Sequence, residues 1–304
     1  MPVYLPIAEM TVNAFGIISL GMIVGFFSGL FGVGGGFLSM PFLMFVGIPP
    51  IVAVTTQNCQ IVASSAAGVI SQWKRRRIDV PMALHMLAGG AGGILVGIGI
   101  FSLLKLLGQI DFAIAAIYTL LLASIGFSML YGIARGFIAR RQGKVNAGEN
   151  KIFNWLKTLP HQNHYTAADV TISIFGPMGI GFLSGLMISI LGAGGGFLIV
   201  PAMIYFLGVP ALMVTGTSML QLLFLSALSC ILHSLTSQSM DLVLAMLLIA
   251  GSVVGTIIGL RASKYIKGLP AHLLLAALVL AVAARMGYDL LVAPHDLFSL
   301  VVED

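Results

Sequence analysis

The chain contains the stretch Gly32-Val33-Gly34-Gly35-Gly36-Phe37-Leu38-Ser39-Met40-Pro41, which returns 160 positions later as Gly192-Ala193-Gly194-Gly195-Gly196-Phe197-Leu198-Ile199-Val200-Pro201. Each copy lies inside a long apolar run. A cluster of glycines interrupts a helix, and at membrane depth an interrupted helix is tolerated only where it lines a cavity within the protein. The duplication therefore predicts a membrane transporter with two related halves and a substrate site at the two interruptions.

Composition independently favours a membrane protein. Hydrophobic residues make up 59% of the chain and charged residues 8%, against about 25% charged residues in soluble domains. The two cysteines lie in apolar runs without paired spacing, so neither a disulfide framework nor a metal site is predicted. A nucleotide-phosphate loop is disfavoured because the flanks of both glycine clusters are apolar and lack the required strand. We predict an all-α polytopic membrane protein whose partners are the lipid bilayer and a small anion, with no nucleic acid and no cofactor.

About five apolar segments fall in each half. They assign residues 12–136 to the first transmembrane repeat, 137–169 to a cytoplasmic connecting loop and 170–293 to the second repeat. The segments are 12–31, 37–47, 51–72, 80–104 and 110–135, then 170–191, 197–208, 211–235, 242–260 and 269–293. The second segment of each repeat is too short to cross a core of about 30 Å at about 1.5 Å per residue. We favour a re-entrant pair of short helices there, with two full crossings as the alternative.

The two halves correspond beyond the glycine clusters. Val54–Asn58 resembles Val214–Ser218, and glycines at spacings of four recur in the fourth segment of each repeat. Those glycines are Gly89, Gly93 and Gly97, then Gly251, Gly255 and Gly259. We interpret them as helix-packing positions.

Basic residues indicate that the repeats have opposite orientations. Lys74–Arg77 follows the third segment of the first repeat, whereas the equivalent loop, Ser234–Met240, has no basic residue. In the next loops the pattern reverses, since Lys105 stands alone and Arg261–Lys267 contains three basic residues. Basic loops face the cytoplasm, which predicts inverted-topology repeats with both termini outside. Inverted repeats provide the two states of alternating access.

An anion is the substrate that these features favour. The short helix after each glycine cluster has partial positive charge at its N-terminus, and two such N-termini can attract an anion without a buried basic side chain. Hydroxyl and amide groups on the following segments could complete the cage. The predicted substrate-binding residues are Gly34, Gly35, Gly36, Phe37, Thr55, Thr56, Gln57, Asn58, Gln60, Gly194, Gly195, Gly196, Phe197, Thr215, Thr217, Ser218 and Gln221.

The same residues carry a resemblance to a known family. The duplicated glycine motif, its preceding Gly-Phe-x-Ser-Gly-Leu sequences (residues 25–30 and 181–186) and the following Gly-Ile/Val-Pro resemble the TauE/SafE family of sulfite and organosulfonate transporters. The likeness covers about residues 15–105 and 172–293. It implies a bacterial or archaeal inner-membrane carrier that exports sulfite, sulfoacetate or a related anion. Thr56-Gln57-Asn58 departs from the simpler form expected after the proline, which leaves the identity of the anion open.

Other interpretations of single features stay open. The protein could be an anion channel or a non-catalytic membrane subunit of a sulfur-metabolism complex. An enzyme is not predicted, because the sequence contains no recognisable set of catalytic residues. His85 and His233 could relay protons in a coupled carrier, although a structural role is favoured. Asp79 and Asp241 open equivalent segments and are interpreted as helix N-caps. The oligomeric state is not predicted.

Overall fold

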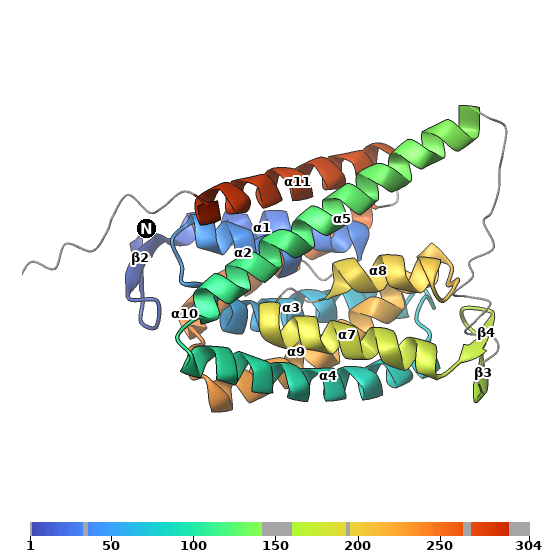
Figure 1. The fold of residues 1–304 in the computed structure, drawn as a ribbon, viewed down its shortest axis with the longest axis horizontal. Coiled ribbons are helices and arrows are strands. Elements are labelled where there is room, and N and C mark those ends of the chain that lie inside the picture. Colours follow the sequence, from blue (N-terminus) through green and yellow to red (C-terminus); the bar gives the residue numbers. More distant parts are fainter. Residues whose placement is uncertain (1, 33–35, 142–159, 193–194, 264–268, 292–304) are drawn as a thin grey trace, which may run out of the picture. The chain divides into compact units, whose positions relative to one another are not determined.

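The computed structural model describes residues 2–32, 36–141, 160–192, 195–263 and 269–291, which are mostly helical (Figure 1). The elements are β1 (Pro2–Leu5), β2 (Met10–Asn13), α1 (Ala14–Phe31), α2 (Gly36–Phe45), α3 (Pro50–Trp73), α4 (Val80–Leu106), α5 (Ile110–Arg141), β3 (Gln162–Tyr165), β4 (Val170–Ser173), α7 (Phe175–Leu191), α8 (Gly196–Tyr205), α9 (Ala211–Thr236), α10 (Leu242–Ala262) and α11 (Leu269–Leu291). They form two compact units, which we describe separately. The first comprises residues 1–111 and 146–267, and the second comprises residues 112–145 and 268–304.

Several helices have the length and composition of membrane spans. Five qualify in the described part of the chain: Ala14–Phe31, Val80–Leu106, Ile110–Ser128, Leu212–Thr236 and Leu242–Ala262. This finding confirms the predicted helix-rich, multi-pass membrane protein. α2 and α8, with 10 residues each, are about 15 Å long and fall well short of a full crossing, as the sequence predicts.

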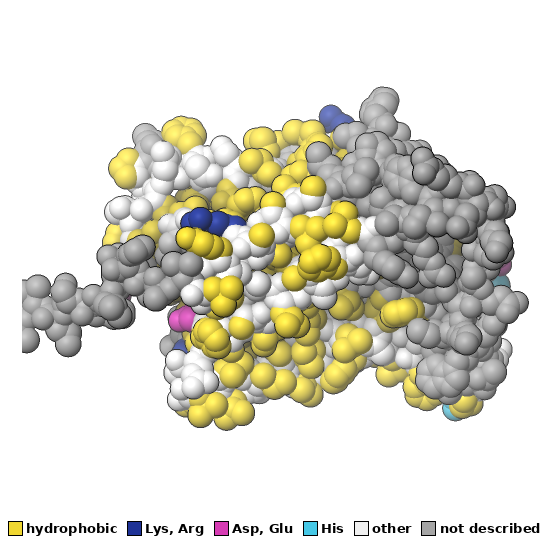
Figure 2. Space-filling model, turned by 45° about the horizontal axis from the view of Figure 1, so that its top comes forward, with side chains coloured by type: hydrophobic (Ala, Val, Ile, Leu, Met, Phe, Trp, Pro, Cys, Tyr) yellow, Lys and Arg dark blue, Asp and Glu magenta, His cyan; other side chains and the backbone are white. Residues whose placement is uncertain are grey.

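The surface suits a lipid environment. Leu84, Leu95 and Leu103 of α4 are more than half exposed. Figure 2 shows hydrophobic side chains spread over the described part of one face, with few charged groups among them. Exposed apolar surface on this scale is unfavourable in water and favourable against lipid.

Two β-hairpins precede α1 and α7, and the all-α prediction missed both. β1 pairs antiparallel with β2 so that Pro2 faces Asn13, and 160 positions later Gln162 of β3 faces Ser173 of β4. The hairpins lie at opposite ends of the first unit (Figure 1). Strands of four residues are too short to produce a clear alternation of polar and apolar side chains, so the sequence pattern did not reveal them. The second hairpin, residues 162–173, includes the end of the predicted connecting loop, 137–169.

Glycines allow two pairs of helices to touch backbone to backbone. α1 packs on α10 and α4 packs on α7. A Cβ added at Gly25 would overlap the backbone of Ser252, and one added at Gly93 would overlap the backbone of Phe182. The same holds for Gly29, Gly89, Gly181, Gly185, Gly251, Gly255 and Gly259. The helix-packing interpretation is thus confirmed for Gly89, Gly93, Gly251, Gly255 and Gly259, whereas a Cβ at Gly97 would first meet the Ser189 side chain. Each pair joins a helix from the first half of the sequence to one from the second half.

The second unit consists mainly of α5 and α11. A Cβ at Gly126 of α5 would meet the side chain of Leu280 on α11, so these helices are also in contact. On α11, Arg285 and Asp289 form an ion pair with an N–O distance of 3.4 Å, and both side chains are partly exposed. An exposed pair four residues apart supports the helix by a few tenths of a kcal/mol.

Candidate functional site

Each glycine cluster coincides with the end of one helix and the start of another. α1 ends where Gly32 adopts a left-handed conformation (φ 73°), and its N–H donates to Ser28 O at 2.8 Å. α7 ends in the same way, since Gly192 has φ 61° and donates to Ile188 O at 3.0 Å. This αL ending favours glycine because a side chain there is strained. The predicted residues Gly34, Gly35 and Gly194 lie outside the described residues.

The opposite half of the sequence contacts each of these helix ends. A Cβ at Gly32 would overlap the side chain of Thr215 on α9, and Ser218 Oγ donates to Gly32 O at 3.1 Å. A Cβ at Gly192 would lie 2.6 Å from Gln57 Nε2 on α3. The chain therefore needs glycine at both positions for two reasons, the positive φ and the close approach of a helix from the other half.

Gln57 of α3 links the C-terminal end of α7 to the short helix α2. Its Nε2 donates to Leu191 O at 3.2 Å, and its Oε1 accepts from Ser39 Oγ of α2 at 3.1 Å. Gln57 is fully buried. Both ends of this amide are thus used within the protein, which gives Gln57 a structural role at the predicted site.

Reciprocal hydrogen bonds tie α3 to the start of α10 and α9 to the start of α4. Asp241 N donates to Thr56 Oγ1 at 3.0 Å, and Asp79 N donates to Thr217 Oγ1 at 3.0 Å. Thr56 and Thr217 are therefore equivalent and lie 161 positions apart. The sequence comparison, which matched Val54–Asn58 with Val214–Ser218, placed this part of the alignment one residue out of register.

Asp79 and Asp241 are N-caps, as predicted, and they also hold the hairpins. Asp79 Oδ1 accepts from Met82 N at 3.0 Å, while its Oδ2 accepts from Ala168 N in the β3–β4 turn at 3.1 Å. Asp241 caps α10 in the same manner and accepts from Ile7 N in the β1–β2 turn at 3.0 Å. Each carboxylate therefore links a helix of one half to the hairpin of the other.

Alanine at Asp79 or Asp241 is expected to lower the free energy of unfolding by about 2 kcal/mol or more, because the cap and the bond to the hairpin are both lost. Asparagine is expected to cost less, since it retains one acceptor oxygen. Thermal unfolding in detergent should rank the variants as wild type, asparagine, alanine at both positions. Equal stability of the alanine variants and the wild type would contradict the assigned roles.

Most of the buried polar atoms without partners belong to α3 or α9, two helices that pack against each other. Eight buried side-chain oxygens in the described ranges have no hydrogen-bond partner: those of Ser28, Asn58, Gln60, Ser65, Gln72, Gln221, Ser226 and Thr256. At the spacing of 161, Gln60 corresponds to Gln221 and Ser65 to Ser226, so four of the eight form two equivalent pairs. An unsatisfied buried polar group costs about 1–3 kcal/mol. Its occurrence at equivalent positions of both halves makes these groups candidates for binding a substrate.

The remaining predicted residues have mixed surroundings. Thr55 Oγ1 lies within hydrogen-bond distance of Ile51 O, Val52 O and Ser239 O, so its hydroxyl is used within the protein. Asn58 Nδ2 donates to Ser229 Oγ of α9 at 3.2 Å, whereas Gln221 Nε2 donates to Ser184 Oγ of α7 at 2.6 Å. The first turns of the short helices contain Gly36 and Phe37 in α2, and Gly196 and Phe197 in α8 after the N-cap Gly195.

The histidines make structural contacts. His233 is fully buried, with Nε2 2.9 Å from Ser189 O and its ring edge-on to Phe101. His85 Nδ1 lies 2.8 Å from Pro81 O and 3.4 Å from the Tyr165 hydroxyl. Burial and the nearby Asp79 carboxylate raise the pKa of Tyr165, in the hairpin, to about 12, so this phenol stays protonated at physiological pH. These contacts favour the structural interpretation of both histidines.

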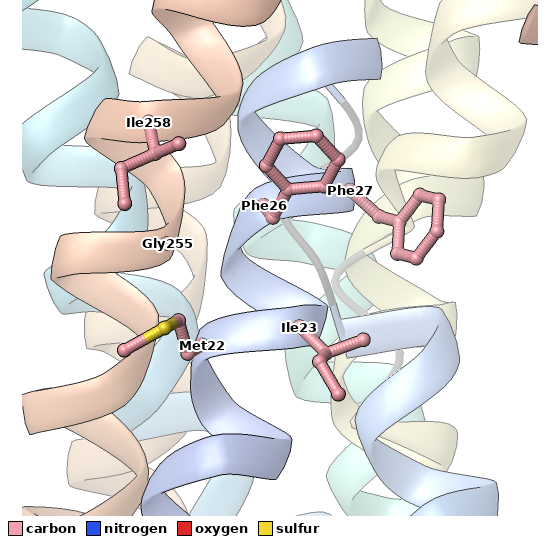
Figure 3. A pocket seen from close by; sticks show the side chains of 6 residues that line it. All are labelled: Met22, Ile23, Phe26, Phe27, Gly255 and Ile258. Carbon is pink, nitrogen blue, oxygen red and sulfur yellow. The ribbon is translucent and has the colours of Figure 1, made fainter.

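An apolar hollow of about 320 Å³ lies between α1 and α10 and contains none of the predicted site residues (Figure 3). Its lining consists of Met22, Ile23, Phe26, Phe27, Gly255 and Ile258. A hollow without polar groups cannot stabilise an anion, because it supplies no hydrogen-bond donors. The candidate site is therefore sought at the unpartnered polar side chains of α3 and α9, which we call the polar cluster: Asn58, Gln60, Ser65, Gln72, Gln221 and Ser226.

Comparison with known proteins gives a consistent result. The family described as Sulfite exporter TauE/SafE matches residues 17–286. Two relatives from Bacillus subtilis (strain 168) are described as "Probable membrane transporter protein YjnA" and "Probable membrane transporter protein YunE". They are 28% and 25% identical, and the matches span 89% and 90% of this chain and 98% and 97% of the relatives. "Sulfite exporter TauE/SafE family protein 3" of Arabidopsis thaliana is 30% identical over 43% of this chain and 27% of its own length. No solved structure gave a significant match.

Proposed function

The chain belongs to the sulfite exporter TauE/SafE family of membrane transporters, and we propose that it is a secondary transporter that exports a small sulfur-containing anion. Sulfite and organosulfonates such as sulfoacetate are the proposed substrates. The observation that carries this proposal is the set of unpartnered polar groups at equivalent positions of α3 and α9. Secondary carriers place their substrate sites near the membrane midplane, where two structural repeats meet.

The two halves are proposed to be inverted-topology repeats. The hairpins that precede α1 and α7 lie at opposite ends of the first unit (Figure 1), as an inversion requires. The reciprocal bonds of Thr56 with Asp241 and of Thr217 with Asp79 support the same relation. Together with the basic loops, they favour an orientation in which Lys74–Arg77 faces the cytoplasm and both termini face outside.

Alternating access follows from this symmetry. If the halves are equivalent but adopt slightly different conformations, exchanging those conformations opens the site to the other side of the membrane. α3 and α9 are the helices around which this exchange occurs, because each contacts the glycine turn of the opposite half. The glycine turns and the starts of α2 and α8 supply backbone dipoles to the anion.

The side chains of the cluster suit a hydrogen-bonding oxyanion. The hydroxyl groups of Ser65 and Ser226 can rotate to donate to an anionic oxygen. The unpartnered oxygens of Gln60 and Gln221 accept from water or from the proton of a partly protonated anion. A site with both kinds of group can bind hydrogen sulfite or a hydrated sulfonate without a buried cation.

Proteoliposomes containing the purified protein should show saturable flux of sulfite or of one sulfonate in a small panel. An imposed pH gradient should stimulate this flux if protons are coupled to the anion. Liposomes without protein provide the baseline, and chloride tests for unselective leakage. Absence of flux for the whole panel, with folded and inserted protein, would contradict the proposed substrate class.

A further inference from the structure

The chain has two cysteines, and the fold brings them to one methionine. Cys59 on α3 and Cys230 on α9 are 171 positions apart in the sequence. Cys59 Sγ lies 3.3 Å and Cys230 Sγ lies 3.6 Å from Met240 Sδ. We refer to these three residues as the sulfur cluster.

We propose that the sulfur cluster binds a soft monovalent cation, of which Cu(I) is the biological example. Two thiolates and one thioether form a ligand set that selects Cu(I) over harder cations. Three sulfur ligands at about 2.3 Å from a metal lie roughly 4 Å apart. The observed separations from Met240 are only slightly shorter, so small side-chain movements suffice to admit the ion.

The segment that carries Met240 is held on both sides. Thr55 Oγ1 donates to Ser239 O at 2.9 Å, and Asp241 N donates to Thr56 Oγ1 at 3.0 Å. These bonds fix the thioether against α3 before any metal binds. All three cluster residues are only half-buried, so the cluster is not sealed inside the protein.

Packing alone does not require sulfur here. At the spacing of 161 that relates Thr56 to Thr217, Cys59 corresponds to Leu220 and Cys230 corresponds to Val69. The counterpart of Met240 is Ile78, because each directly precedes the aspartate that caps the next helix. The equivalent place in the other half thus has three aliphatic residues where the sulfur cluster has three ligands. The same comparison supplies a control variant, Cys59→Leu/Cys230→Val/Met240→Ile, which copies a combination that the fold already uses.

Zinc is a poorer fit. Structural zinc sites have four ligands, most often thiolate or imidazole, and the described residues contain no group of three or more His, Cys, Asp or Glu side chains that could hold a metal. His233, one turn after Cys230, is already bonded to Ser189 O. The cluster therefore offers the trigonal sulfur set that Cu(I) accepts and zinc does not favour.

Binding of Cu(I) releases two protons. One Cu(I) ion replaces the protons of the Cys59 and Cys230 thiols, giving a complex with net charge −1 and two protons in solution. The apparent dissociation constant is therefore expected to fall by roughly 100-fold per pH unit while both thiols are protonated. No electron transfer is involved.

The test is anaerobic competition for Cu(I) between the full-length reduced protein in detergent and a chromogenic Cu(I) chelator. We expect one Cu(I) per chain and X-ray absorption showing only sulfur ligands at about 2.3 Å. Cys59→Ser and Cys230→Ser should each weaken binding at least roughly 100-fold, and Met240→Leu roughly tenfold. Met246→Leu, at an exposed position on α10, should bind as the wild type does.

Two results would overturn the proposal. Equal Cu(I) uptake by the wild type and the aliphatic control variant would place the metal elsewhere. No uptake by the reduced wild type, together with formation of a Cys59–Cys230 disulfide under mild oxidation, would identify the cysteines as a redox pair instead. Redox-stable Ag(I) provides a second probe, since it should raise the melting temperature of the wild type but not that of the control variant.

Discussion

Gln60→Leu is expected to reduce anion transport by roughly ten- to a hundredfold, the equivalent of one hydrogen bond to a charged ligand. The protein should remain as stable as the wild type or become more stable. Gln60 is buried and its Oε1 has no partner among the described residues, so leucine of similar volume removes an unfavourable polar atom. Flux into proteoliposomes and thermal unfolding in detergent provide the two measurements.

Gln57→Leu is the matched control, because Gln57 lies one turn away on the same helix and both ends of its amide are bonded. Leucine there leaves Leu191 O without its donor and is expected to cost about 1–3 kcal/mol of stability. A Gln60→Leu variant that transports at the wild-type rate would show that the polar cluster is not the anion site. A large loss of stability in that variant would show that Gln60 has a structural role.

Gly181→Ala is expected to destabilise the protein by several kcal/mol, or to prevent its folding. The added Cβ would overlap the backbone oxygen of Met86, where α7 meets α4. Backbone cannot move aside as a flexible side chain can, so the two helices would have to separate. Yield of monodisperse protein and melting temperature are the measurements.

Gly179→Ala, two residues earlier on α7, provides the control. Nothing lies within 4 Å of the added Cβ there, and alanine has the higher helix propensity by about 1 kcal/mol. The two substitutions are therefore expected to change stability in opposite directions. If both were tolerated equally, α4 and α7 could not be in the close contact described above.

The sequence predicts the helices well because their ends are marked by proline, glycine or charge. The predicted segments 80–104 and 211–235 correspond to Val80–Leu106 and Ala211–Thr236. The helix-packing glycines and the two aspartate caps were also identified correctly. These features depend on local sequence, since a helix end or a small-residue spacing is encoded within a few neighbouring positions.

Other features depend on contacts that no local pattern encodes. The β-hairpins consist of four-residue strands, and their turns are held by Asp79 and Asp241 from distant helices. The one-residue shift between α3 and α9 is established by their bonds to those aspartates. The spacing of Cys59 and Cys230 predicts neither a disulfide nor a metal site, yet the packing of α3 on α9 places both next to Met240.

Counterflow of radiolabelled sulfite is the measurement that tests carrier function most directly. Proteoliposomes loaded with unlabelled sulfite are diluted into a trace of labelled sulfite, without an imposed membrane potential or pH gradient. A carrier that alternates between two states exchanges the anions one for one, so label should accumulate transiently above its equilibrium level, and Gln60→Leu should lose this overshoot. Simple equilibration of the label without overshoot would contradict alternating access and identify a channel.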